Sequence, residues 1–240
     1  MSEFHNYRYT AQTHVGLKRK VNEDTILALP EQDIWMVADG MGGHQAGDFA
    51  SRAIADAVAM IPVGLDPTAR MHALRDAIQN AHQLIRTEAE ARGAGVIGAT
   101  VVALMMANGH FVGLWAGDSR IYRLRDGQIE MLTTDHSSVA EYVLAGKMTW
   151  DEAEQHPQSN AITRAVGVGD ILELDKVRGE ARSGDRFLVC SDGLTKYATF
   201  AMLQDMLSTT PIETVVERLV QVALAGGGAD NISAIVVDVL

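Results

Sequence analysis

The sequence is most informative at Val37-Ala38-Asp39-Gly40-Met41-Gly42-Gly43-His44. The apolar run 34–38 predicts a strand that ends at an aspartate, and the glycines that follow let the backbone bend sharply and approach a ligand closely. This geometry can present the Asp39 carboxylate and the Gly40 carbonyl oxygen to one cation. An ordinary turn with Asp39 as a local cap explains the stretch equally well, because Asp-Gly is a common turn signal.

Four more acidic turns lie at the ends of apolar runs elsewhere in the chain. Any one of them alone is explained as a structural turn, but together they suggest a shared role. Only folding can bring them together, and clustered buried carboxylates repel one another unless a cation neutralises them. Mg²⁺ and Mn²⁺ prefer oxygen ligands, so the sequence predicts a divalent metal site. The four turns are Asn22-Glu23-Asp24, Gly117-Asp118-Ser119-Arg120, Asp192-Gly193 and Asp230-Asn231.

Composition excludes several classes of protein. With 240 residues, the chain is long enough for one domain with a full hydrophobic core. The formal net charge of -11 and the lack of a Lys/Arg-rich face argue against a nucleic-acid partner. Cys190 is the only cysteine, so no intramolecular disulfide can form. Residues 1–10 lack the apolar core of a signal peptide, and no apolar run approaches the roughly 18 residues of a membrane span. We therefore expect a cytoplasmic protein with no membrane partner.

Short apolar runs bounded by turn residues predict many strands. Asp126-Gly127 is typical of a tight hairpin turn between two of them. Strands are predicted at 7–12, 25–29, 34–38, 100–107, 111–116, 121–124, 129–132, 173–180, 186–190 and 232–239.

Helical periodicity interrupts these strands in three places. Residues 47–61 carry apolar side chains on one stripe, and Asp66-Pro67 supplies a cap and a first-turn proline for a second helix. A third helix precedes the last strand, where Thr210 and Glu213 have capping-box spacing. Strands and helices do not alternate regularly, which disfavours a doubly wound parallel sheet and favours helices that cover stacked sheets. No repeat or linker interrupts the chain, so residues 1–240 are expected to form one domain.

The order and spacing of the acidic motifs resemble those of the metal-dependent Ser/Thr protein phosphatases of type 2C, the PPM family, in its bacterial form. The resemblance runs from about residue 12 to the C-terminus. It implies an α+β fold, a four-layer αββα sandwich with two central antiparallel sheets flanked by helices. The matching stretches are Gly16-x-x-Arg19-x-x-Asn22-Glu23-Asp24, Asp39-Gly40-Met41-Gly42-Gly43, Gly98-x-Thr100, Gly117-Asp118-Ser119-Arg120, Ser191-Asp192-Gly193 and Asp230-Asn231-Ile232.

The resemblance also implies roles for individual residues. Asp39 would bridge two ions of Mn²⁺ or Mg²⁺, with the Gly40 carbonyl on one of them. Asp192 and Asp230 would complete the direct protein ligands. The remaining carboxylates would act less directly: Asp24, with Glu23 as a further candidate, through metal-bound water, and Asp118 on a weaker third ion beside Asp192. Arg19 would bind the substrate phosphate, because its planar fork donates paired hydrogen bonds.

Two ions about 3.5–4 Å apart can ionise a shared water near neutral pH, which would then attack phosphorus directly. The leaving oxygen needs a proton, and His44 is the candidate general acid. Animal relatives place a histidine where this chain has Met41, so His44 could equally be a surface residue at a helix start. Lys196 stands where many relatives have an acidic residue, which predicts a weakened third metal site.

Residues 136–160 correspond to the variable flap in which substrate selectivity of the family is usually placed. They are more polar than their surroundings, with helical patterns at 138–144 and 151–155. Thr149 and Glu152 have capping-box spacing there. Residues 160–167 are predicted to form the strand that follows the flap.

Two motifs point elsewhere and are set aside. Gly93-Ala94-Gly95-Val96-Ile97-Gly98 fits a dinucleotide-binding pattern, but it follows a helix and precedes a strand, which is the reverse of such a site. Cys190, six residues before Lys196, nearly matches a cysteine phosphatase loop, but that loop needs arginine at its last position. Cys190 also ends an apolar strand, so it is interpreted as a buried core residue.

The sequence therefore predicts a bacterial protein serine/threonine phosphatase that opposes a Ser/Thr kinase. Its partners would be phosphorylated proteins, including the kinase and its substrates, and the chain is expected to be a monomer. A phosphatase-like regulatory module without turnover is one alternative, although the intact acidic residues argue against it. A hydrolase of small phosphate esters is another, because the same site could cleave both kinds of substrate.

Overall fold

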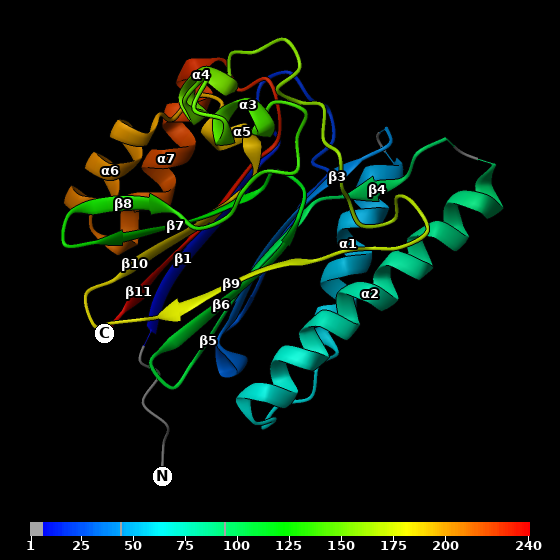
Figure 1. Ribbon diagram of the computed structural model, residues 1–240, viewed down its shortest axis with the longest axis horizontal. Helices are drawn as coiled ribbons and strands as arrows, with labels where there is room; N and C mark the ends of the chain where they lie inside the picture. The colour runs from blue at the N-terminus through cyan, green and yellow to red at the C-terminus, as the bar shows by residue number, and fades with distance from the viewer. Residues whose placement is uncertain (1–6, 44, 94) are drawn as a thin grey trace.

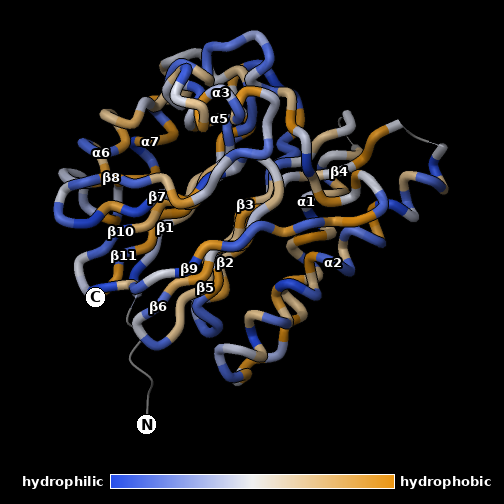
Figure 2. The backbone as a smooth tube through the Cα atoms, viewed as in Figure 1, coloured by the Kyte–Doolittle hydropathy of each residue, from blue (hydrophilic) through white to orange (hydrophobic). Residues whose placement is uncertain are grey.

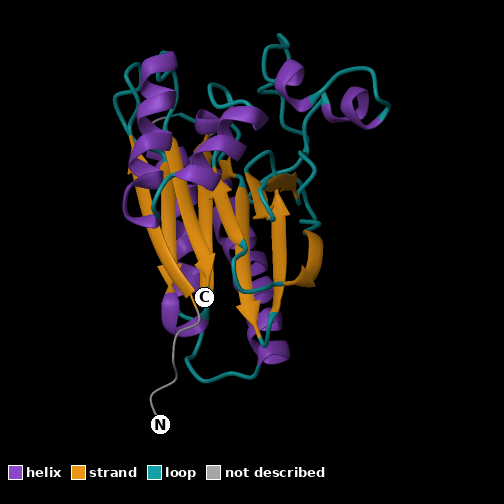
Figure 3. Ribbon diagram, turned by 90° about the vertical axis from the view of Figure 1, so that its left-hand side faces the viewer, coloured by secondary structure: helices purple, strands orange, loops and turns teal. Residues whose placement is uncertain are grey.

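Two antiparallel sheets form the centre of the computed structural model, which describes residues 7–43, 45–93 and 95–240. The five-stranded sheet has the order β1-β11-β10-β7-β8. The six-stranded sheet has the order β2-β3-β5-β6-β9, with β4 paired to β3. Figure 3 shows the long strands side by side as one central block. Their bounds are β1 Tyr7–His14, β2 Asp24–Leu29, β3 Ile34–Met41, β4 Gly98–Ala99, β5 Val101–Ala107, β6 His110–Ala116, β7 Arg120–Arg125, β8 Gln128–Met131, β9 Asp175–Glu180, β10 Arg186–Cys190 and β11 Ile232–Val239.

Helices cover the outer face of each sheet (Figure 1). On one side, α1 and α2 pack on the six-stranded sheet, and on the other side α6 and α7 pack on the five-stranded sheet. The short helices α3, α4 and α5 lie near the upper ends of the strands. The bounds are η1 Pro30–Gln32, α1 Gln45–Ala59, α2 Pro67–Arg92, α3 Ala140–Leu144, α4 Trp150–Ala153, α5 Asp192–Thr195, α6 Phe200–Thr209 and α7 Ile212–Gly226.

Three separate hydrophobic clusters lie between these layers. One joins α1 and α2 to the six-stranded sheet, one joins the five-stranded sheet to α5–α7, and the third lies between the two sheets. Figure 2 shows the hydrophobic segments concentrated along the strands, which are covered on both faces. Burial on both faces explains why β11 is buried along its whole length. The predicted α+β sandwich, with two antiparallel sheets flanked by helices, is confirmed.

Local signals place several boundaries as predicted. The Asp66 side chain accepts hydrogen bonds from the backbone N–H groups of Thr68 and Ala69 at the start of α2, and Pro67 occupies its first turn. Asp126 and Gly127 both have positive φ, at 51° and 75°, as the tight β7–β8 hairpin requires.

Other expectations were wrong. Residues 160–167 form no strand and instead make isolated bridges at Ile162 and Val166. Thr210 and Glu213 form no capping box, because Pro211 is the N-cap of α7 and no side chain caps that helix. Helix α6 was not predicted at all.

Among the described residues, no helix combines the length and apolar composition that crossing a bilayer requires.

Candidate metal centre

The first two candidate carboxylates lie opposite each other on neighbouring strands. The β2–β3 register pairs Asp24 directly with Asp39. The Asp24 side chain is buried, and its Oδ2 accepts hydrogen bonds from Ser233 Oγ at 2.7 Å and Ser191 Oγ at 2.9 Å. Because both serines belong to the other sheet or the turn after it, Asp24 links the two sheets at this end of the sandwich.

Thr100 and Gly40 shape the backbone around Asp39. The Thr100 hydroxyl accepts a hydrogen bond from the Asp39 N–H at 3.2 Å and lies 2.7 Å from the hydroxyl of Ser119, the residue after Asp118. A Cβ atom at Gly40 would lie 2.2 Å from the Gly47 carbonyl oxygen, so only glycine allows α1 to begin this close to β3.

The remaining carboxylates come from three turns. Asp118 lies between β6 and β7, Asp192 is the first residue of α5, and Asp230 lies two residues before β11. A Cβ atom at Gly193 would lie 1.9 Å from the Asn231 carbonyl oxygen. Glycine therefore follows Asp192 because the turn before β11, which carries Asp230, packs against it.

Asn231 fixes the loop that carries Arg19. Its Nδ2 donates to the carbonyl oxygens of Val15 and Val21, at 2.9 and 3.0 Å, and its Oδ1 accepts from the Glu23 N–H at 2.8 Å. The sequence showed Asn231 only as part of a motif, and these contacts explain why an amide with both donor and acceptor groups is needed there.

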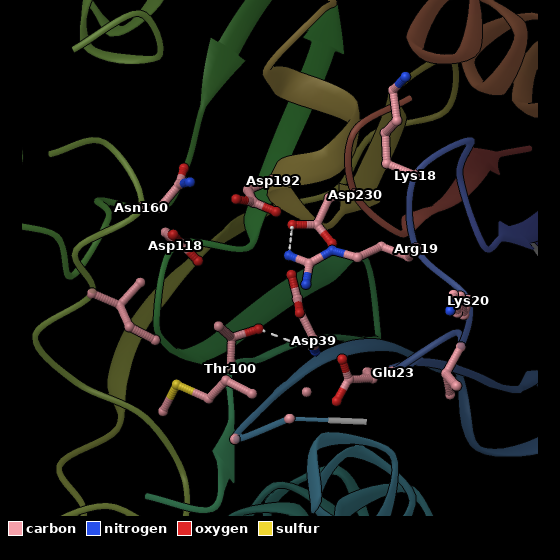
Figure 4. A pocket seen from close by; sticks show the side chains of 16 residues that line it. Lys18, Arg19, Lys20, Glu23, Asp39, Thr100, Asp118, Asn160, Asp192 and Asp230 are labelled. Carbon is pink, nitrogen blue, oxygen red and sulfur yellow. Dashed lines mark hydrogen bonds and ion pairs between the residues drawn. The ribbon is translucent and has the colours of Figure 1, made fainter. Parts of the chain in front are cut away.

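These segments surround a cavity of about 530 Å³. Figure 4 shows Asp39, Asp118, Asp192 and Asp230 directed toward a common space, with Glu23 at its lower edge. Asp24 is not among the lining residues and lies behind Asp39. The structure thus brings together the predicted carboxylates from segments far apart in the sequence. The lining residues are Lys18, Arg19, Lys20, Val21, Glu23, Asp39, Gly40, Met41, Gly42, Gly43, Thr100, Asp118, Asn160, Ile162, Asp192 and Asp230.

The carboxylates strongly disfavour one another's ionisation. Burial raises the pKa of Asp24 to about 7, against the hydrogen bonds from Ser233 and Ser191, which lower it, and the charges of Asp192 and Asp230 add a smaller increase. Burial, and then the surrounding carboxylates, raise the pKa of Asp39 and of Asp118 well above the ordinary value. The pKa of Asp192 is also raised, chiefly by burial and next by Asp230.

The donor set fits hard divalent cations. Asp24 Oδ1 and Asp192 Oδ1 are buried carboxylate oxygens that accept no hydrogen bond. Such atoms are costly unless a cation satisfies them, and oxygen-rich sites suit Mg²⁺ and Mn²⁺. No three His, Cys, Asp or Glu side chains in the described part of the chain are placed to hold an ion as they stand.

Arg19 is ion-paired with one of the predicted ligands. Its Nη2 donates to Asp230 Oδ2 at 2.7 Å, and this hydrogen bond is the main reason that the pKa of Arg19 is raised. In Figure 4 the guanidinium extends from the loop into the cavity, toward Asp230. Its side chain is half exposed, so the group is accessible to an anion that enters from solvent.

The flap is anchored to the centre by a buried arginine. Arg120, two residues after Asp118, makes a bidentate pair with Asp135 at 2.9 and 2.6 Å. Its Nη1 contacts Glu154 Oε1 of the flap at 2.8 Å, and Thr195 of α5 donates to the same oxygen at 3.0 Å. One flap carboxylate therefore binds both segments that carry Asp118 and Asp192, a role that no sequence signal indicated.

Three other predicted residues have separate outcomes. His44 lies outside the described residues. Lys196 Nζ contacts the Asn160 side chain at 3.5 Å, next to the cavity. Cys190 is fully buried, and burial raises the pKa of its thiol to about 12, as expected for a core residue.

Comparison with known proteins identifies relatives over nearly the whole chain. The family model described as protein phosphatase 2C matches residues 15–234. The serine/threonine protein phosphatase PstP of Mycobacterium tuberculosis is 36% identical over 237 residues, which cover 97% of this chain and 45% of PstP. The chain thus spans about half the length of that relative.

Two solved structures are similar in fold and sequence. PppA, a key regulatory component of T6SS in Pseudomonas aeruginosa, superposes with a TM-score of 0.91 and 44% identity over 98% of both chains. The catalytic domain of PstP in complex with two manganese ions has a TM-score of 0.84 and 34% identity, also over 98% of both chains.

Proposed function

The chain belongs to the protein phosphatase 2C family, and from this premise we propose that it is a metal-dependent phosphatase of phosphoserine and phosphothreonine in proteins. The observation that carries the proposal is the convergence of buried, mutually repelling carboxylates on one cavity beside an arginine. Buried carboxylates in such a cluster are retained at a cost in stability, which is expected where they hold cations for catalysis.

We propose that two divalent ions occupy the cavity, held by Asp39, the Gly40 carbonyl, Asp192 and Asp230. When bound, they would supply an activated water nucleophile and neutralise charge on the phosphoryl group. The manganese-bound PstP domain supports this assignment by similarity. Asp24 would support the ions from behind Asp39, where its Oδ2 is held by two serines.

Arg19 is proposed to bind the phosphate. Asp230 engages Nη2, and in the described part of the chain no contact of Nη1 or Nε is found, so these donors can meet phosphate oxygens. The leaving serine or threonine oxygen needs a proton when the P–O bond breaks, and His44 remains the proposed donor. Asp118 is proposed to hold a weaker third ion beside Asp192, which Lys196 would disfavour by its charge.

The proposed substrates are phosphorylated proteins, and the proposed role is to oppose a Ser/Thr kinase. PstP and other relatives carry serine/threonine phosphatase names, which supports this substrate class. A monomeric state and a cytoplasmic location remain predictions.

The proposal is tested with p-nitrophenyl phosphate and a phosphoserine peptide, each assayed with Mn²⁺, with Mg²⁺ and with EDTA. We expect turnover of both substrates with metal and at least a 100-fold loss in EDTA, because the ions supply several kcal/mol of transition-state stabilisation. Turnover of the aryl phosphate alone would favour a small-ester hydrolase. A folded protein without metal-dependent turnover of either substrate would contradict the proposal and favour a regulatory module.

A further inference from the structure

Three consecutive residues of one loop supply basic side chains to the cavity lining, and Lys196 contacts Asn160 next to the cavity. Among the described residues that line it, Lys18, Arg19 and Lys20 are the only basic side chains, in a chain whose formal net charge is -11. Arg19 extends inward to Asp230, whereas Lys18 points away from the carboxylates in Figure 4, and Lys20 lies on the other side of Arg19. Arg19 is thus the inner cation, at the proposed phosphate site, and Lys18 and Lys20 form an outer pair.

The loop that carries the outer pair is anchored to the rest of the protein by its backbone. Asn231 holds the loop on both sides of the pair, at Val15 and Val21, and the Leu17 N–H donates to the Gly228 carbonyl oxygen at 2.7 Å. Both lysines are exposed, and within the described part of the chain neither ammonium group makes a hydrogen bond or ion pair. A well-anchored loop that presents unpaired ammonium groups beside the phosphate site is suited to bind anions of the substrate.

The charge pattern argues for an acidic substrate segment. A phosphopeptide with acidic neighbours would be repelled by a protein of net charge -11 unless cations at the cavity mouth offset that field. Neighbours of a phosphoserine in an extended peptide lie only about 3.5 Å per residue from it, so with the phosphate at Arg19 they come within reach of the same loop. Lys18 and Lys20 flank Arg19 in that loop.

We propose that Lys18 and Lys20 form a subsite for acidic residues next to the phosphorylated residue, so that the preferred substrates are acidic segments of phosphoproteins. This inference rests on the proposed phosphatase function and adds the substrate class. The ammonium groups act by charge at the surface, which affects capture of the peptide and not the breaking of the P–O bond.

The test compares short phosphoserine peptides that differ only in having glutamate, alanine or lysine around the phosphoserine. With Mn²⁺ at low salt, we expect kcat/KM of wild type to be about five-fold higher for the glutamate peptide than for the alanine peptide, as two exposed ion pairs would give. The lysine peptide should be the poorest substrate. The preference should largely disappear near 1 M NaCl, where the screening length is about 3 Å.

Reversing the charge of the two lysines tests whether they cause the preference for acidic peptides. The double variant Lys18→Glu/Lys20→Glu should invert the order of the glutamate and lysine peptides. Lys176→Glu/Arg178→Glu is the matched control, because it makes the same change in net charge at exposed positions of β9, outside the cavity lining. The control should keep the wild-type order.

Three outcomes would overturn the proposal. The first is equal kcat/KM of wild type for the three peptides, and the second is an equal change of preference in both double variants, which would indicate a general charge effect. The third, absence of manganese-dependent p-nitrophenyl phosphate turnover in wild type, would overturn the phosphatase function itself. The first two leave that aryl phosphate turnover intact, so the two failures are distinguishable.

Discussion

Asp39 lies in the most repulsive environment of the cavity. Burial raises its pKa, followed by the charges of Asp24, Asp192, Asp118 and Asp230 in that order. In the unfolded chain this carboxyl ionises freely, whereas in the metal-free folded protein it must keep its proton or bury a charge. The residue that we propose as the bridging ligand therefore destabilises the protein until cations bind.

Asp39→Asn should separate catalysis from stability. We expect activity to fall about 1,000-fold or more, because a bridging ligand is lost. The metal-free protein should melt about 2–4 °C higher than wild type, since a neutral amide removes the repulsion. Phosphatase assays with Mn²⁺ and thermal melts in EDTA measure the two effects.

The matched control is Asp76→Asn, at an exposed position of α2. It should leave both activity and melting temperature near the wild-type values. A lower metal-free melting temperature for Asp39→Asn would contradict the repulsion that we infer, and wild-type activity would contradict the metal role.

At the scale of elements, two helix starts show when capping-box spacing in the sequence predicts a real cap. Thr149 caps α4 as its spacing with Glu152 predicted, and both side chains accept hydrogen bonds from the partner's backbone N–H. Thr210 has the same spacing before α7, yet it is already the C-cap of α6, and its carbonyl oxygen accepts from Arg186 at 2.7 Å. A capping box needs a residue that is free to start a helix, and sequence spacing does not report that.

Helix α6 was missed although its signals are present. Thr199 caps it by accepting a hydrogen bond from the Met202 N–H, and Leu203 and Leu207 make its buried face at i, i+4 spacing. The helix is short, so a pattern of few apolar residues was not distinguished from a loop.

One flap carboxylate, Glu154, reaches across three segments. Glu154→Ala removes the ion pair with Arg120 and the hydrogen bond from Thr195, although Arg120 keeps its bidentate pair with Asp135 and its contact with the Trp150 ring. Breaking one partner of a buried pair costs about 3 kcal/mol, so the flap should detach more often. We expect faster proteolysis within 136–160 and a larger rise in KM for phosphopeptides than for p-nitrophenyl phosphate.

Glu141→Ala is the control for this change, because Glu141 is an exposed flap residue in α3 whose side chain makes no hydrogen bond or ion pair among the described residues. Its proteolysis rate and KM values should match those of wild type. Unchanged flap proteolysis in Glu154→Ala would show that this ion pair does not hold the flap.

For the whole molecule, the carboxylate cluster links stability to pH and to metal. Burial raises the pKa of Asp24 to about 7 in the folded protein, whereas the unfolded value is about 3.9, so the folded state binds the proton more tightly. The stabilising contribution is complete below about pH 4 and is lost as the pH rises toward 7. For Asp24 alone it is on the order of 4 kcal/mol.

In EDTA, the free energy of unfolding of wild type should therefore fall between pH 4 and pH 7 relative to that of Asp24→Asn. The comparison with the variant matters because burial lowers the pKa of His82 and His136, whose effect on stability has the opposite sign near pH 6. Denaturant titrations across this range measure the difference. Saturating Mn²⁺ should remove most of it in wild type, and parallel pH profiles in EDTA would contradict the inference.

Signals between residues close in the sequence were sufficient to predict much of the fold and of the candidate site. Some features depend only on residues that are close in the sequence, so short segments are enough to predict them. They include the strand lengths, the cap at Asp66, the hairpin at Asp126-Gly127 and the order of the acidic motifs. These signals predicted helices that cover stacked sheets and pointed to the carboxylates of the candidate centre, whereas the two antiparallel sheets were implied by the resemblance to the phosphatase family.

Long-range packing determined the features that the sequence did not predict. Asp24 meets Ser191 and Ser233 across 167 and 209 residues, Glu154 joins the flap to the segments that carry Asp118 and Asp192, and Lys18 is directed away from the carboxylates that Arg19 approaches. Such contacts follow from the stacking of two sheets and from which strands become neighbours, and neither leaves a local pattern in the sequence. The balance of charge in the cavity likewise exists only once folding excludes water from it, because in the extended chain the same carboxylates are solvated and far apart.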